Sequence, residues 1–118
     1  MDADKNVQGV LRDAGMTALV DIEKFPFGSV PFILLEPLPG TRAAGDFENA
    51  AWSMSSWART RGAARRLWLD AADAIRAAYL GGDPRINFAD TSALPVVVPS
   101  GVADVWRYEG TIRASVRQ

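Results

Sequence analysis

Residues 102–118 read VADVWRYEGTIRASVRQ, and this stretch decides the fold because its side chains alternate almost without fault. One face carries, in order, Trp106, Tyr108, Gly110, Ile112, Ala114 and Val116, and the other carries Arg107, Glu109, Thr111, Arg113, Ser115 and Arg117. A period of two is typical of a half-buried β-strand. We therefore predict that this strand lies inside a sheet, with its mostly apolar face turned toward the core.

Shorter strands are predicted upstream. Residues 17–23 and 47–58 read as strands, and residues 30–36 form a continuous apolar run. A run this short and apolar indicates a central strand that is buried on both faces. Residues 83–100 are expected to be irregular apart from a short strand at Val96–Val98. Because consecutive strands joined by short turns favour antiparallel pairing, we expect a mainly antiparallel sheet.

Two helices are predicted. Residues 4–14 place apolar side chains at helical spacing and precede Gly15, a suitable C-cap. A long helix begins after Thr60, which can cap it, and ends at Gly81 and Gly82. The expected fold is a single α+β domain over residues 1–118. Its sheet has four to five mainly antiparallel strands, with the N-terminal helix and the long helix packed on it.

Residues 37–46 lie between two predicted strands and contain two prolines, two glycines and, near the middle, Arg42. Such a length is unusual for a plain connection between strands. Binding residues often lie on loops of this kind. We therefore expect a loop that projects from the sheet and brings Arg42 into contact with a partner.

Composition argues against several kinds of chemistry. The chain has no His and no Cys, and 13 basic and 14 acidic side chains leave a net charge of −1. Thiolate nucleophiles, disulfides, His-based metal sites and the commonest general base are therefore missing. The basic excess usual for nucleic-acid binders is missing too, as are a membrane-spanning run and a signal peptide. We predict no catalytic, cofactor-binding or metal-binding residues, no membrane association, and synthesis in the cytoplasm.

Arginines cluster around the start of the long helix, at Arg59, Arg61, Arg65 and Arg66. Arginine in a first helical turn opposes the helix macrodipole, so its presence there does not serve the helix itself. One interpretation is a contact site for phosphate or for an acidic partner. The alternative is an ordinary solvated face of the helix.

Three apolar side chains fall where the periodicity does not require them in the core: Trp57, Leu69 and Leu80. Exposed apolar groups on a small domain often mark protein–protein contacts. With Arg42, these residues are the candidates for a subunit interface. The alternative is that both faces of the sheet are covered and that these side chains belong to the core.

The elements follow one another in a recognisable layout. It runs from the helix ending Ala14-Gly15-Met16, through the strand Val30-Pro31-Phe32-Ile33-Leu34-Leu35 and the loop at 37–46, to the strand around Trp52. It continues with the alanine-rich helix ending Ala77-Ala78-Tyr79-Leu80-Gly81-Gly82 and closes with Val105-Trp106-Arg107-Tyr108-Glu109-Gly110-Thr111-Ile112-Arg113. Over nearly the whole chain, this order and spacing resembles the tail terminator family of long-tailed, siphophage-type bacteriophages.

The resemblance implies a structural role in virion assembly at the head-proximal end of the tail. Such proteins form a ring, usually a hexamer, on the last ring of tail tube protein. The ring stops tube growth and provides the surface to which the head docks through a head–tail connector or head-closure protein. They bind no cofactor and catalyse nothing, and genomic DNA can pass through the lumen without specific binding. The loop at 37–46 would then face a neighbouring subunit or that lumen.

Other functions stay open. Within virion assembly, the alternative is a head–tail connector or another tail-completion (neck) protein. From a different class, the chain could be a small nucleic-acid-binding module that uses the arginines between Arg59 and Arg66. A small enzyme is the third alternative. Oligomeric state separates these classes, because a ring former assembles into large oligomers whereas a binding module is monomeric or dimeric.

Overall fold

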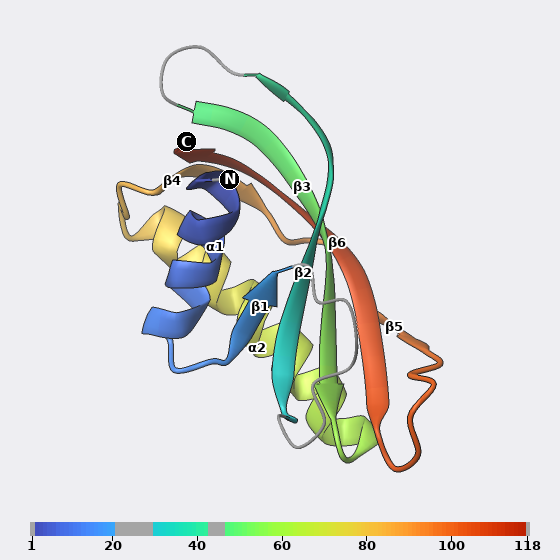
Figure 1. The fold of residues 1–118 in the computed structure, drawn as a ribbon. Helices are drawn as coiled ribbons and strands as arrows, with labels where there is room; N and C mark the ends of the chain where they lie inside the picture. The colour runs from blue at the N-terminus through green and yellow to red at the C-terminus, as the bar shows by residue number, and fades with distance from the viewer. Residues whose placement is uncertain (1, 21–29, 43–46, 118) are drawn as a thin grey trace.

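The computed structural model describes residues 2–20, 30–42 and 47–117, which form one sheet and two helices (Figure 1). The elements are α1 (Asp2–Asp13), β1 (Ala18–Val20), β2 (Phe32–Arg42), β3 (Phe47–Ala58), α2 (Arg61–Leu80), β4 (Ile86–Asp90), β5 (Val96–Val98) and β6 (Trp106–Arg117). The strand order is β1-β2-β3-β6-β4, and β5 pairs with another part of β6. The predicted α+β class is confirmed, with six strands in the sheet.

Strand pairing is antiparallel except at one edge. β2 with β3, and β6 with each of β3, β4 and β5, pair antiparallel. β1 runs parallel to β2, with Ala18 opposite Ile33. The expectation of a mainly antiparallel sheet is confirmed, with this one parallel pair at the edge.

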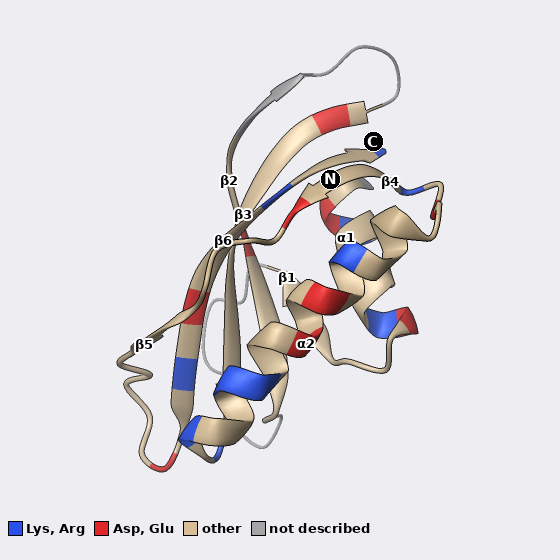
Figure 2. Ribbon diagram, turned by 180° about the vertical axis from the view of Figure 1, so that it is seen from behind, with Lys and Arg blue, Asp and Glu red and all other residues tan. Residues whose placement is uncertain are grey.

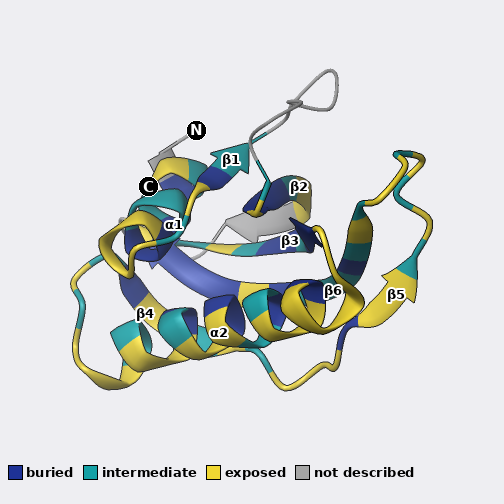
Figure 3. Ribbon diagram, turned by 90° about the horizontal axis from the view of Figure 1, so that it is seen from below, coloured by how far each residue is buried: buried dark blue, intermediate teal, exposed yellow. Residues whose placement is uncertain are grey.

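Both helices pack on one face of the sheet (Figures 1 and 3). The main core lies between the helices and the sheet. It contains side chains with no exposed surface, among them Leu11 of α1, Trp52 of β3, Trp68 and Ile75 of α2, and Ile112 of β6. Full burial of an apolar side chain of this size contributes about 1.5–3 kcal/mol. The apolar face of the C-terminal strand therefore supplies the centre of the core, as the alternation predicts.

Gly110 allows β6 to pass closely beneath α2. A Cβ atom at this position would lie 2.6 Å from Cζ2 of Trp68. The indole of Trp68 is fixed in turn, because it is fully buried and donates its N–H to the main-chain carbonyl oxygen of Met54 at 2.7 Å. The glycine in the alternating stretch is thus a close-packing position.

The ends of α2 agree with the sequence prediction. Thr60 precedes the helix in an extended conformation, and its hydroxyl accepts a hydrogen bond from the amide of Ala63 at 3.1 Å. At the other end the amide of Gly81 donates to the carbonyl of Ala77, and Gly82 adopts a φ of +79°. A hydroxyl cap and a left-handed glycine are the usual signals that begin and end a helix.

Two segments differ from their predicted structures. Residues 37–42, expected in a loop, continue β2, which contains a bulge between Leu38 and Thr41. The remaining residues of that loop, 43–46, lie outside the described ranges. Strand β4, within a segment expected to be irregular, was missed because its register also shifts, between Ile86 and Phe88. In both cases an irregularity hides a strand from an alternation test.

Prolines explain how β2 can continue through residues 37–39. The amide of Ile33 donates to the carbonyl of Thr17, so its N–H points away from β3. Backbone direction alternates along a strand, and the nitrogen of Pro37 therefore also faces away from β3. Pro39 falls in the bulge. A proline at the outer side of a strand removes no hydrogen bond from the sheet and discourages pairing with another chain.

Candidate functional site

Trp57, a predicted subunit contact, belongs to the interior of the domain. Its side chain is 8 % exposed and stacks on Phe32 on the sheet face opposite the helices, with ring centroids 5.6 Å apart. Its indole N–H donates to the hydroxyl of Ser55, and the guanidinium of Arg107 lies 5.0 Å from its ring centroid. The premise that Trp57 is exposed is therefore wrong, because this part of the second sheet face is covered as well.

The other three predicted contact residues lie in different surroundings. Leu69 is partly buried and packs against the main core. Arg42 is the last residue of β2, where its backbone is in register with Glu48 of β3. Leu80 ends α2 with 67 % of its surface exposed. Of these side chains, Leu80 is the one that is apolar and freely accessible to a partner.

Leu80 ends an exposed stripe along α2. Arg66, Asp70, Asp73, Ala77 and Leu80 follow one another at spacings of four and three residues, which places them on one side of a helix. All five are exposed. The stripe itself changes from basic to acidic and then to apolar along the helix, but the exposed Arg76 adjoins both Asp73 and Leu80 at helical spacing, and Figure 2 shows basic, acidic and again basic segments along α2. We call Asp73, Ala77 and Leu80 the Leu80 patch.

The predicted arginine cluster lies at the opposite end of α2, and its four members are exposed. Arg61 donates from Nε to the hydroxyl of Tyr108 at 3.0 Å and lies 6.0 Å from the ring centroid of Trp106. Arg59, Arg65 and Arg66 form no ion pair within the part of the chain that the structure describes. The first turn of α2 contains no acidic residue. This end of the domain therefore carries positive charge that nearby side chains do not balance.

An apolar groove of about 520 Å³ lies beside this cluster, lined by residues 97–100 and 104–106 of the turn between β5 and β6. The hydroxyl of Ser100 holds the turn together, because it lies within hydrogen-bond distance of the carbonyl oxygens of Val102 and Val105, at 3.0 and 2.7 Å. Gly101 and Asp104 take left-handed φ angles of +74° and +59°. We call this feature the Trp106 groove.

Trp106 is more exposed than the alternation of β6 predicts. It was expected in the core, but 41 % of its surface is exposed because β6 begins at the margin of the area that α2 covers. Four of the seven large apolar side chains that are exposed in the described residues lie in the short stretch from 94 to 106: Leu94, Val96, Val97 and Trp106. The alternation of β6 gave no signal of this exposure, because it assigns Trp106 to the same face as the buried Ile112 and Val116.

The other three tryptophans have their indole N–H groups engaged inside the protein. Trp52 donates to Asp4 at 2.8 Å, Trp57 to Ser55 at 2.9 Å, and Trp68 to Met54 at 2.7 Å. Trp106 instead contributes to a surface groove. Tryptophan and arginine are the residues most enriched at the energetic centres of protein interfaces. The Trp106 groove with its neighbouring arginines is therefore the surface that best fits a binding role.

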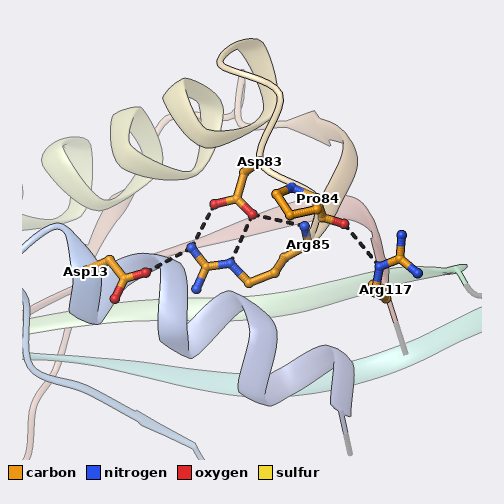
Figure 4. A network of polar contacts seen from close by, with 5 residues as sticks. All are labelled: Asp13, Asp83, Pro84, Arg85 and Arg117. Atoms are coloured by element: carbon orange, nitrogen blue, oxygen red, sulfur yellow. Dashed lines mark hydrogen bonds and ion pairs between the residues drawn. The ribbon is translucent and has the colours of Figure 1, made fainter.

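A second polar cluster has a structural role (Figure 4). Arg85 lies between Asp83, at 2.7 Å, and Asp13 at the end of α1, at 2.9 Å. Pro84, between Asp83 and Arg85, joins this cluster to the last strand, because its carbonyl accepts a hydrogen bond from Nε of Arg117 at 3.2 Å. Hydrogen bonds from Arg85 hold the pKa of Asp83 below its ordinary value and outweigh burial, which acts in the opposite direction. The cluster attaches α1 to the segment that follows α2.

Comparison with known proteins gives this chain no relatives: no protein-family model matches it, and no curated protein is significantly similar. Among the described residues, no group of three or more acidic side chains is placed to hold a metal ion. Within the same residues, neither helix is long and apolar enough to cross a membrane.

Proposed function

We propose that this protein is a non-enzymatic virion assembly protein, a tail terminator that forms a ring at the head-proximal end of a phage tail. The ring caps the tail tube, stops its growth and provides the surface on which the head docks. Its partners are further copies of itself, the tail tube protein, and a head–tail connector or head-closure protein. Genomic DNA passes through the lumen without specific binding.

One observation carries this proposal, beside the layout that resembles the family. The domain has two separate apolar surface features, one at each end of α2: the Leu80 patch and the Trp106 groove. A helix of 20 residues is about 30 Å long. Two different surfaces this far apart suit a heterologous contact, in which each copy uses one surface toward each neighbour. Repetition of such a contact closes into a ring when the rotation permits.

The arginine cluster supports a second candidate, a small nucleic-acid-binding module. Arg59, Arg65 and Arg66 are exposed and without ion pairs to described residues, so they are available to phosphate groups. Against this, the net charge of the chain is −1, and the surface beside the cluster is an apolar groove. A protein partner fits this combination better than a nucleic acid does.

The test of the proposed function uses a phage that encodes this chain. We expect a stop codon early in its gene to yield tails of irregular length that do not join heads, because nothing caps the growing tube. Electron microscopy of lysates measures the length of the tails and the fraction of them that are joined to heads. The wild-type gene supplied on a plasmid is the control. Tails of normal length that fail to join heads would replace the terminator by a neck protein. Normal tails joined to heads would refute both roles.

A further inference from the structure

We infer that the Trp106 groove of one copy binds the Leu80 patch of the next copy, so that subunits associate head to tail. The inference rests on the proposed function in one respect only, that the protein assembles with itself. It adds the two surfaces that meet and the side chains that determine the fit.

The groove has the properties of a receptor for an apolar side chain. Val97 and Trp106 form part of its wall, and each is 41 % exposed in the isolated domain. The volume of about 520 Å³ has room for a leucine with the end of the helix that carries it. Binding there would remove the exposed indole of Trp106 from water, which gives the contact its main favourable term.

The edge of the sheet beside the groove is formed by β5, and it is a poor template for an added strand. We therefore expect a side chain, not a strand, to make the contact. The amide of Arg117 donates to the carbonyl of Arg85, on the side of β6 that faces β4 and β5. Because backbone direction alternates along a strand, the amides of Arg107 and Glu109 face the same side. These two residues are in register with Val98 and Val96 of β5. Val96 and Val98 therefore direct their N–H groups toward β6, and Val97 directs its N–H outward. Pro95 and Pro99 on either side of β5 have no N–H group to offer to an added strand.

The Leu80 patch is the matching surface on the same chain. Leu80 projects from the last turn of α2 and, at 67 %, is more exposed than any other large apolar side chain of the described residues except Leu94. Leu94 precedes β5, whose residues line the groove, so it belongs to the groove end of the domain. Leu80 lies at the opposite end of α2, which is the separation that a head-to-tail contact requires.

Charge supports the same pairing. The groove lies beside Arg61, and the basic residues Arg59, Arg65 and Arg66 follow at the same end of α2. The Leu80 patch includes Asp73, with the exposed Asp70 one turn before it and the exposed Arg76 between Asp73 and Leu80; Asp83, after the helix end, is already paired with Arg85. Asp104, the acidic residue of the groove wall, is outnumbered by the arginines at the start of α2. A head-to-tail contact brings the arginines at the start of one α2 toward Asp70 and Asp73 of the next, which outnumber Arg76 there, and complementary charge of this kind guides association and fixes register.

The test removes each surface separately. Trp106→Ser abolishes the groove's aromatic wall, Leu80→Asp replaces the inserted side chain with a charge, and Leu38→Ser is the matched control, an exposed leucine outside both surfaces. Sedimentation velocity gives the size of each variant between about 10 µM and 1 mM. We expect wild type and Leu38→Ser to form large oligomers. Each of the other two variants should associate at least about 30-fold more weakly, because a central interface residue is lost.

A mixture of the two variants distinguishes the proposed contact from other interfaces. Trp106→Ser retains the Leu80 patch and Leu80→Asp retains the groove, so an equimolar mixture should form a one-to-one dimer and stop there. Each variant alone should be monomeric, with the circular dichroism spectrum of the wild type as evidence of folding. Arg65→Glu with Arg66→Glu is a second way to weaken the contact: it replaces attraction to the acidic residues near Leu80 by repulsion, so association should fall and added salt should no longer weaken it.

Several results would overturn the inference. These are a wild type that stays monomeric at 1 mM, an oligomer that both substitutions leave intact, or a mixture that yields no dimer. Binding of double-stranded DNA that Arg65→Glu with Arg66→Glu abolishes, with no self-association, would assign the same surface to nucleic acid instead. The proposed function is tested separately. If the mixture forms the dimer but the gene knockout leaves tails normal, the proposed function fails and the contact stands. If the mixture forms no dimer but tails grow to irregular lengths, the contact fails and the proposed function stands.

Discussion

The close approach of β6 to α2 makes a strong and measurable prediction about Gly110. In Gly110→Ala the new methyl group would lie 2.6 Å from Cζ2 of Trp68, well inside van der Waals contact. The ring cannot turn away freely, because its N–H is bonded to the carbonyl of Met54 at 2.7 Å and its side chain is fully buried. Either the strand or the indole must move, and both belong to the main core.

The magnitude follows from two costs and one gain. Overpacking of a core by one methyl group costs roughly 1–3 kcal/mol. Weakening the buried hydrogen bond between Trp68 and Met54 adds about 1–3 kcal/mol when the donor is left unsatisfied. Restricting the unfolded chain by replacing glycine returns about 0.4–1 kcal/mol. We therefore expect Gly110→Ala to lower the free energy of unfolding by roughly 1–5 kcal/mol, with the centre of this range at about 3 kcal/mol.

Urea denaturation followed by tryptophan fluorescence measures this change. With a slope of roughly 1–3 kcal/mol per molar urea, the midpoint should fall by about 1–2 M. Gly62→Ala is the matched control, because Gly62 lies in α2 with nothing within 4 Å of its virtual Cβ. That substitution should stabilise the protein by up to about 1 kcal/mol, since alanine is the better helix former.

A double-mutant cycle tests the cause directly. Trp68→Phe removes the ring atoms that the new methyl group would strike, so Gly110→Ala should cost much less in that background than in the wild type. The reasoning is refuted if Gly110→Ala unfolds within about 0.5 kcal/mol of the wild type. It is also refuted if its cost is the same with phenylalanine at position 68.

Two further predictions concern residues outside the groove. Arg85→Met should lower the free energy of unfolding at neutral pH, because Arg85 lowers the pKa of Asp83 in the folded state. This contribution is present above about pH 4 and is lost as pH falls. The free energy of unfolding of the variant should therefore change less with pH below about pH 4 than that of the wild type. Trp57→Ala should lower the free energy of unfolding by about 3–5 kcal/mol, because its ring is buried against Phe32. An equally stable Trp57→Ala protein with impaired assembly would restore Trp57 as a contact residue.

The sequence alone determined the elements whose signal is local and uninterrupted. The alternation from Trp106 to Arg117 fixed the last strand, and Thr60 with Gly81 fixed the ends of the long helix. The apolar run in β2 correctly indicated a strand with neighbours on both sides. Each of these signals involves residues close together in the chain, where backbone geometry and periodicity suffice.

The tertiary structure decided which side chains remain accessible. Trp57 and Trp106 both lie on strands with clear alternation, yet Trp57 is buried and Trp106 is exposed. Coverage differs because Phe32 and Arg107 lie against one ring, whereas α2 begins too late to cover the other. Periodicity assigns a side chain to a face, but only the arrangement of distant segments determines whether that face is covered at that point. The groove, and with it the candidate site, could therefore not be read from the sequence.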